Sequence, residues 1–241
     1  MKCIISCEHA SNRVPRQYTH AFAGKEKVLV SHQAYDPGAA AIAHKLAGRL
    51  NASVYLGTIT RLLIDLNRSP ANRKTLYTSY SRKLTHGDRE LLFCKYYLPY
   101  RASVEREINR LTAKDKPVLH ISVHSFSPVK GGLVRKADIG LLYDPARRNE
   151  KVICAYLASM LQEETGVLRV RRNYPYQGKT DGFTSFMRKK LSVKLYAGIE
   201  IEINQTPLSL GNKKKRKLEQ LLEEGIRNIL KRPDFSGLIK I

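Results

Sequence analysis

Short apolar runs that end in polar residues recur along the chain and predict the strands of one sheet. The clearest run is Pro117–Phe126, PVLHISVHSF, in which β-branched residues fill a segment that starts at one proline and stops just before another. Runs of the same kind predict strands over Lys2–Cys7, Ser53–Gly57, Thr58–Asn67, Ala137–Tyr143, Val167–Arg172 and Lys194–Asn204.

Between these runs, apolar residues recur at the spacing of a helix. The pattern predicts helices over Ala39–Leu50, Asp88–Ala113 with Pro99 as a candidate break, Glu150–Thr165, Phe183–Leu191 and Leu218–Lys231. Alternating strands and helices favour an α/β fold: a mixed, largely parallel central sheet flanked by helices on both faces. The chain shows no linker and no internal repeat, so we expect one domain over residues 1–241.

Polar clusters follow four of the predicted strands, which is where ligands bind in open α/β sheets. The clusters are Glu8-His9 with Asn12, Asp65-Asn67-Arg68, His124-Ser125, and Glu202-Asn204; Asp36 precedes the first predicted helix. Each cluster also has a plain structural interpretation. Arg68 could pair with Asp65 to fix a loop, and Glu200 and Glu202 could lie on an exposed sheet edge. His120 shares the sheet face of His124 but lies deeper, so we expect it in the core.

The histidines and carboxylates of these clusters fit a metal-dependent hydrolase. A catalytic zinc takes about three protein ligands of the histidine and carboxylate types and keeps one position open. The natural nitrogen ligands are His9 and His124, and either Glu8 or Asp36 would supply an oxygen. The sequence leaves the choice between these two carboxylates open.

The same interpretation needs a base and a group that holds the substrate. Glu200 and Glu202 share one face of a predicted strand, and either could take the proton of an attacking water. Arg68 offers a planar fork for a substrate carboxylate. Other catalytic patterns are missing: the chain has no GxSxG, no GxxxxGK[ST] and no GxGxxG.

Charge and cysteine content limit the classes of partner. The chain carries 43 Lys and Arg against 21 Asp and Glu, a formal net charge of +22, which favours a polyanion or an anionic substrate. The run Lys213–Lys217 has no interleaved aromatic residues, which favours a solvated basic face over a nucleic-acid site. Four cysteines without a CxxC pair, no 18-residue apolar run and no secretory segment predict a cytoplasmic protein with no membrane partner.

Taken in chain order, these motifs resemble the N-formylglutamate amidohydrolase family. The most specific matches are TRLLIDLNR at 60–68 and His124-Ser125-Phe126, in this order and spacing. Weaker matches are EHASNRVP at 8–15, Asp36-Pro37-Gly38-Ala39, Arg135 with Asp138-Ile139-Gly140, the loop Asn173–Gly178, and Glu202-Ile203-Asn204. The matches extend from residue 3 to about residue 208.

The resemblance implies a fold like that of the zinc carboxypeptidases and hydrolysis of an N-acyl amide on an acidic amino acid. It implies that Asn67-Arg68 grips the substrate carboxylate, that His124 binds zinc and that Glu202, rather than Glu200, is the base. Carboxypeptidases carry a glutamate three residues after the first histidine, whereas this chain has Asn12 there. A second departure is the segment 205–208, QTPL, which lacks the tyrosine-bearing sequence of characterised amidohydrolases.

We therefore expect a cytoplasmic, metal-dependent amidohydrolase, with zinc as the expected metal and a small anionic acyl-amino acid as substrate. The expected substrate-binding residues are Arg68, Asn67, Arg61, Asn12 and Arg135. Two alternatives stay open: an inactive relative that binds nucleic acid or another polyanion through its basic surface, and a desuccinylase or carboxypeptidase on the same scaffold. The sequence does not specify an oligomeric state.

Overall fold

The computed structural model describes residues 1–163, 168–206 and 212–233. The main-sheet strands are β1 (Lys2–Cys7), β2 (Ser53–Leu56), β3 (Val118–Phe126), β6 (Ile139–Leu142), β7 (Val170–Arg172) and β8 (Tyr196–Asn204). Their order is β2-β1-β3-β8-β6-β7, with the first four parallel and β6 antiparallel to β8. A separate hairpin joins β4 (Val129–Lys130) to β5 (Leu133–Val134).

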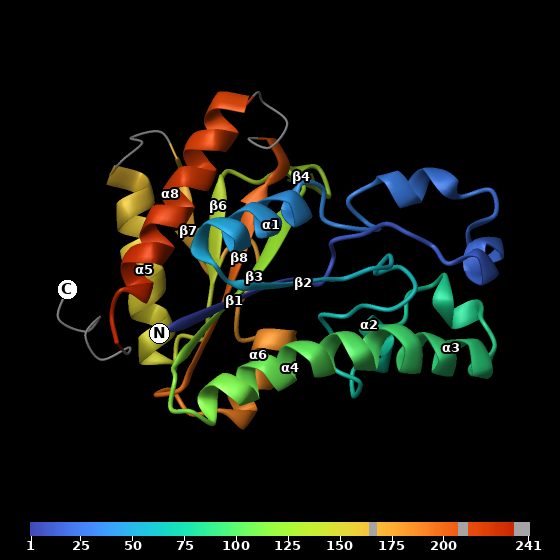
Figure 1. The fold of residues 1–241 in the computed structure, drawn as a ribbon. Helices are drawn as coiled ribbons and strands as arrows, with labels where there is room; N and C mark the ends of the chain where they lie inside the picture. The colour runs from blue at the N-terminus through green and yellow to red at the C-terminus, as the bar shows by residue number, and fades with distance from the viewer. Residues whose placement is uncertain (164–167, 207–211, 234–241) are drawn as a thin grey trace.

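Helices cover both faces of this sheet (Figure 1). The helical elements are η1 (Arg16–Phe22), η2 (Glu26–Val30), α1 (Ala39–Leu50), α2 (Arg73–Leu76), η3 (Ser81–Lys83), α3 (His86–Leu92), the π-helical turn η4 (Phe93–Tyr97), α4 (Leu98–Thr112), α5 (Arg148–Glu163), α6 (Phe183–Lys190) and α8 (Asn212–Leu230). Helices α1, α5 and α8 lie on one face, and α4 and α6 lie on the other. The predicted α/β architecture is thus confirmed.

The two faces differ because the side chains of the central strands alternate. In β3, Leu119, Ile121 and Val123 join the main apolar core beneath α1, α5 and α8. The residues between them, His120 and Ser122 among them, point to the opposite face together with the polar residues of β8. This alternation supplies a core on one side and a row of buried polar groups on the other.

One predicted strand is wrong. Thr58–Asn67 forms turns, and its backbone bonds to other loops, with the Thr60 N–H donating to the Arg13 carbonyl at 2.9 Å. Its apolar residues are buried in a second cluster that includes Ile59 and Leu63 and packs with the residues of η1 and α3. Burial in a second core, not membership of the sheet, explains the apolar run.

The predicted long helix exists, and it is not broken at its proline. Helix α3 continues through η4 into α4, and Pro99 lies in the first turn of α4. A π-helical turn shifts the hydrogen-bond register by one residue, and Pro99, which has no N–H to donate, lies two residues after the end of this turn at Tyr97. Thr165 and Val167, at the ends of two predicted elements, lie outside the described residues. No helix of the described chain is long and apolar enough to span a membrane.

Candidate metal centre and active-site cavity

Three segments bring His9, Asp36 and His124 together at the carboxyl end of the sheet. His9 follows the end of β1, and His124 lies near the end of β3. Asp36 lies in the turn before α1, where its N–H donates to the His9 carbonyl at 2.9 Å and its own carbonyl accepts from the Ala39 N–H at 3.1 Å. Gly38 completes this turn with a φ of 81°, a conformation that favours glycine.

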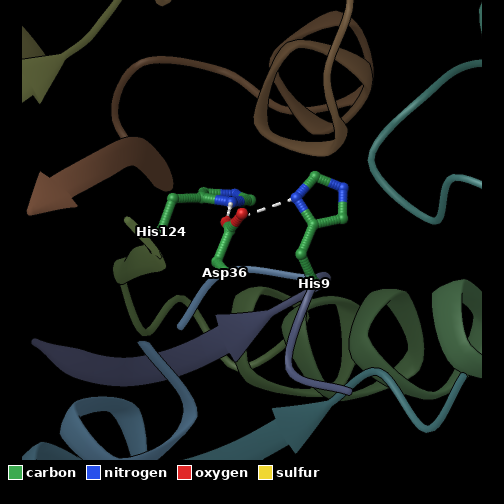
Figure 2. A group of neighbouring side chains, drawn as sticks. All are labelled: His9, Asp36 and His124. Atoms are coloured by element: carbon green, nitrogen blue, oxygen red, sulfur yellow. Dashed lines mark hydrogen bonds and ion pairs between the residues drawn. The ribbon is translucent and has the colours of Figure 1, made fainter. Parts of the chain in front are cut away.

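Both imidazoles present Nδ1 to the same carboxylate oxygen. Asp36 Oδ2 lies 2.7 Å from His124 Nδ1 and 3.3 Å from His9 Nδ1, and all three residues are buried. Figure 2 shows the Asp36 carboxylate between the two rings. One nitrogen or oxygen from each residue falls within 4.8 Å of the others, so the three side chains form a group that could hold a metal ion.

A second carboxylate lies behind each imidazole. His9 Nε2 is 2.7 Å from Asp65 Oδ1. His124 Nε2 is 3.2 Å from Glu8 Oε2 and 2.9 Å from the Ser122 hydroxyl, which itself donates to Glu8 Oε2 at 2.6 Å. Histidines that bind metals are oriented in this way, because a partner at one ring nitrogen fixes the lone pair of the other.

The carboxylates of this cluster are ionised despite their burial. Burial alone would raise the pKa of Glu8, Asp36 and Asp65, but their neighbours hold all three pKa values well below the usual range: His124 acts on Glu8, Arg61 and then His9 act on Asp36, and His9 acts on Asp65. Burial opposes the charged form of His124, but its bonds to Asp36 and Glu8 raise its pKa well above the usual value. Three ionised carboxylates thus surround the two imidazoles, and Arg61 and His124 balance part of their charge.

Arg61 closes this cluster from the side of Asp36. Its Nη1 lies 3.1 Å from Asp36 Oδ1 and 3.0 Å from His9 Nδ1, while its other nitrogens donate to the carbonyls of His32 and Gln33. In its neutral form, His9 accepts from Arg61 at Nδ1 and donates from Nε2 to Asp65. Arg61 thus lies beside the candidate ligands, and all three of its guanidinium nitrogens are engaged by other residues of the protein.

Glu202 is a buried carboxyl without a fixed partner. It lies opposite His124 in the β3–β8 pairing, and its Oε2 has no hydrogen-bond partner in the described residues. Burial raises its pKa to about 7, and the nearby Asp36 and Glu200 act in the same direction. Glu200, two residues earlier, instead accepts a hydrogen bond from the Thr184 hydroxyl at 2.8 Å. A carboxyl that titrates near neutral pH suits general base catalysis.

The candidate ligands and Glu202 line one cavity of about 480 Å³. Most of its other lining residues are polar or cationic: His32, Gln33, Arg61, Asn67, Arg68, Ser125, Ser127, Lys130, Arg135, Gln177, Thr180, Asp181 and Glu200. Arg68 donates to the Asp181 carbonyl, and its Nε lies 4.0 Å from Asp65 Oδ2. The guanidinium of Arg135 packs against the rings of Phe126 and Tyr176, with 5.6 and 5.2 Å to the ring centroids.

The structure brings most of the predicted site residues together but leaves two outside the cavity. The Asn12 amide donates to the Leu29 carbonyl at 2.9 Å, and the carboxyl of Glu8 lies behind His124. Of the two carboxylates that the sequence left open, Asp36 joins the histidine cluster. The contact of Asp65 with His9 was not predicted, although Asp65 stands two residues before Asn67 in a cluster of candidates. Tyr176 belongs to the loop Asn173–Gly178 that matched the family, whereas the placement of Lys130 at the cavity has no signature in the sequence.

The fold and the site define an α/β protein with a buried histidine–carboxylate cluster at the carboxyl ends of its strands. Within that class, the chain belongs to the N-formylglutamate amidohydrolase family, whose model matches residues 1–208. The resemblance found from the sequence motifs is thereby confirmed.

Solved structures show the same fold. A gene product of Agrobacterium tumefaciens, Atu2144, is 28% identical with a TM-score of 0.78, covering 95% of this chain and 90% of that chain. An N-formylglutamate amidohydrolase from Ralstonia eutropha JMP134 is 17% identical with a TM-score of 0.69, covering 95% and 92%. A comparison with curated proteins gives no match.

Proposed function

We propose that this protein is a metal-dependent amidohydrolase that removes the acyl group from a carboxylate-bearing N-acyl amino acid, with N-formylglutamate as the first substrate to test. One observation carries the proposal: the unpartnered carboxyl of Glu202 lines the same cavity as the cluster of His9, Asp36 and His124. The membership of the family supports the reaction class.

The residues present fit a divalent metal of the zinc type. Two imidazole nitrogens and one carboxylate oxygen are the donor set of many catalytic zinc sites. His9, Asp36 and His124 would hold the ion, and the buried position of all three, with ligand atoms within 4.8 Å of one another, supports this assignment. When bound, such an ion makes water more acidic and polarises the amide carbonyl.

Glu202 would move the proton of the reaction. Its carboxylate would accept a proton from the water that attacks the carbonyl carbon, and then donate it to the amide nitrogen as the C–N bond breaks. The products are a free carboxylic acid and the free amino acid. A pKa near 7 suits a group that must both accept and release a proton in this sequence.

The cationic lining supports an anionic substrate. Arg68 presents a guanidinium to the cavity and would bind the α-carboxylate through two parallel hydrogen bonds. Arg135, held between Phe126 and Tyr176, and Lys130 lie on the same cavity and suit a second negative group. Arg61 has its donors engaged by Asp36 and by loop carbonyls, so it would hold Asp36 in place rather than bind a substrate carboxylate.

The experiment combines metal analysis with a substrate panel. Protein purified without added metal is analysed for bound metal and assayed on the N-formyl, N-acetyl and N-succinyl forms of glutamate, with N-formyl-leucine as the control for the side-chain charge. We expect about one equivalent of metal, loss of activity with a chelator and recovery with Zn²⁺. A protein that takes up no metal, cleaves none of these amides and binds nonspecific DNA with a steep salt dependence would contradict the proposal.

A further inference from the structure

The carboxyl of Glu8 occupies a buried position that the proposed reaction does not use. Glu8 directly precedes His9 in the chain, yet its side chain contacts the other histidine. Its Oε2 lies 3.2 Å from His124 Nε2 and accepts from the Ser122 hydroxyl at 2.6 Å, and its Oε1 accepts from the Tyr100 hydroxyl at 3.2 Å. The residue is 1% exposed.

The contact lies on the opposite side of the imidazole from the candidate ligands. Asp36 meets His124 at Nδ1, 2.7 Å away, whereas Glu8 meets it at Nε2. One imidazole ring therefore separates the Glu8 carboxylate from the place where Nδ1 and Asp36 converge. A side chain in this position acts on the ligand and not on the ion.

No Lys or Arg in the described part of the chain forms an ion pair with Glu8. A buried carboxylate without a cation is costly, so its charge must be balanced by the group it contacts. The His124 imidazole is that group. With Nδ1 holding a metal, His124 would carry its hydrogen at Nε2, where the Ser122 hydroxyl at 2.9 Å and the Glu8 carboxylate at 3.2 Å are the acceptors, and Ser122 in turn donates to Glu8.

We infer that Glu8 is a positioning residue that orients His124 and strengthens it as a metal ligand, and that it is not itself a ligand. The inference rests on the metal site of the proposed function. Tyr100 from α4 and Ser122 from β3 hold the two oxygens of Glu8, so the orientation of His124 is set from a helix and a strand outside the cavity.

The test measures metal affinity instead of turnover. The dissociation constant of Zn²⁺ is determined by chelator competition for the wild type, Glu8→Gln and Glu219→Gln. Glu219, on α8, is equally buried but pairs with Lys45 on α1 and does not line the cavity. It therefore serves as the matched control. We expect Glu8→Gln to bind Zn²⁺ about 10–100-fold more weakly, as losses of such partners do in other metal sites, and Glu219→Gln to match the wild type.

A spectroscopic measurement separates a positioning residue from a ligand. With Co²⁺ in place of Zn²⁺, the visible spectrum of saturated Glu8→Gln should keep the wild-type band shape, whereas Asp36→Asn should change it. A Glu8→Gln spectrum that changes as Asp36→Asn does would make Glu8 a ligand and overturn the inference.

Other outcomes are equally decisive. A Zn²⁺ affinity of Glu8→Gln within twofold of the wild type overturns the inference and leaves the proposed function standing, while a wild type that binds no metal removes both. If Glu8→Gln does not fold, Tyr100→Phe replaces it, because this change leaves the Glu8 carboxyl in place and removes only the Tyr100 hydroxyl, which contacts Glu8 Oε1 at 3.2 Å and the Tyr55 carbonyl at 3.3 Å. That variant should weaken Zn²⁺ binding about fivefold, the effect of one hydrogen bond of about 1 kcal/mol, and unchanged binding would again overturn the inference.

Discussion

Glu202 and His124 are direct neighbours across the β3–β8 pair, at one register position and on one face of the sheet. His124 is fixed by hydrogen bonds at both ring nitrogens, whereas Glu202 Oε2 is buried without a hydrogen-bond partner in the described residues. An unsatisfied buried group costs about 1–3 kcal/mol. The sheet thus places a fixed candidate ligand beside a carboxyl that lacks a hydrogen-bond partner. Buried carboxyls with shifted pKa values of this kind cluster at functional sites.

Glu202→Gln should lose turnover while keeping the metal. The glutamine fills the same volume but cannot accept a proton, so we expect kcat to fall about 10²–10⁴-fold. Metal content and the circular dichroism spectrum should match those of the wild type. Glu200→Gln is the matched control, since Glu200 already accepts a hydrogen bond from Thr184. If Glu202→Gln retained wild-type turnover, the base would have to be sought elsewhere.

The same substitution should stabilise the metal-free protein at neutral and higher pH. Burial raises the pKa of Glu202 from 4.5 to about 7, so the native state holds its proton more tightly than the unfolded chain does. Ionising Glu202 in the native state therefore destabilises the fold. This loss of stability is absent below pH 4.5, grows as the pH rises to about 7 and stays constant above it. Its full size is about 3 kcal/mol. Urea unfolding at pH 4 and pH 8 measures it, and equal stabilities of variant and wild type at pH 8 would contradict the prediction.

The sequence predicted which polar residues share a face of the sheet, but it did not predict which residues of different segments contact one another. In β3 and β8, alternation places Ser122, His124 and Glu202 on one face, because side-chain direction in a strand has a period of two residues. No such rule links His9 to Asp36, 27 residues away, and only the turn before α1 shows that this carboxylate, not that of Glu8, meets both histidines. Local adjacency was misleading for Glu8, because the chain turns between residues 8 and 9.

The turn-rich segment at 58–67 shows the other limit of sequence patterns. Ile59, Leu63 and Ile64 are fully buried, and an apolar run of this length is typical of a strand. Here the burial comes from a second apolar cluster, which forms only when η1 and α3 pack against the segment. The run revealed burial correctly, but burial alone does not distinguish a strand from a packed turn.

Arg68→Lys should weaken substrate binding more than it slows the chemical step. Lysine keeps the charge but loses the planar fork, so one of two parallel hydrogen bonds to a substrate carboxylate disappears. A hydrogen bond to a charged group contributes about 1.5–3 kcal/mol, so KM should rise about 10–100-fold with a smaller change in kcat. Arg73→Lys, in the exposed start of α2, is the control. If Arg68→Lys lowered the stability and left KM unchanged, the role of Arg68 would instead be structural, through its pairing with Asp65.

His120 should make the fold sensitive to acid in a way that can be measured apart from the metal site. Its ring is buried, with Nε2 2.8 Å from the Ser6 hydroxyl and Nδ1 2.8 Å from the Tyr196 hydroxyl. Burial lowers its pKa from 6.5 to about 4, so the unfolded chain binds the proton more readily than the native state does. The stability contributed by neutral His120 is complete above pH 6.5 and is lost as the pH falls toward 4, by up to about 3 kcal/mol.

His120→Gln removes this titration, so its stability should fall less between pH 7 and pH 4 than that of the wild type. Urea unfolding of both proteins in the presence of a chelator keeps the metal ligands out of the comparison. The difference between the two pH profiles isolates His120, because the other titrating groups are common to both proteins. If the stability of the two proteins changed with pH in parallel, His120 would gain a proton in the native state at no cost. Its burial between Ser6 and Tyr196 would then not lower its pKa.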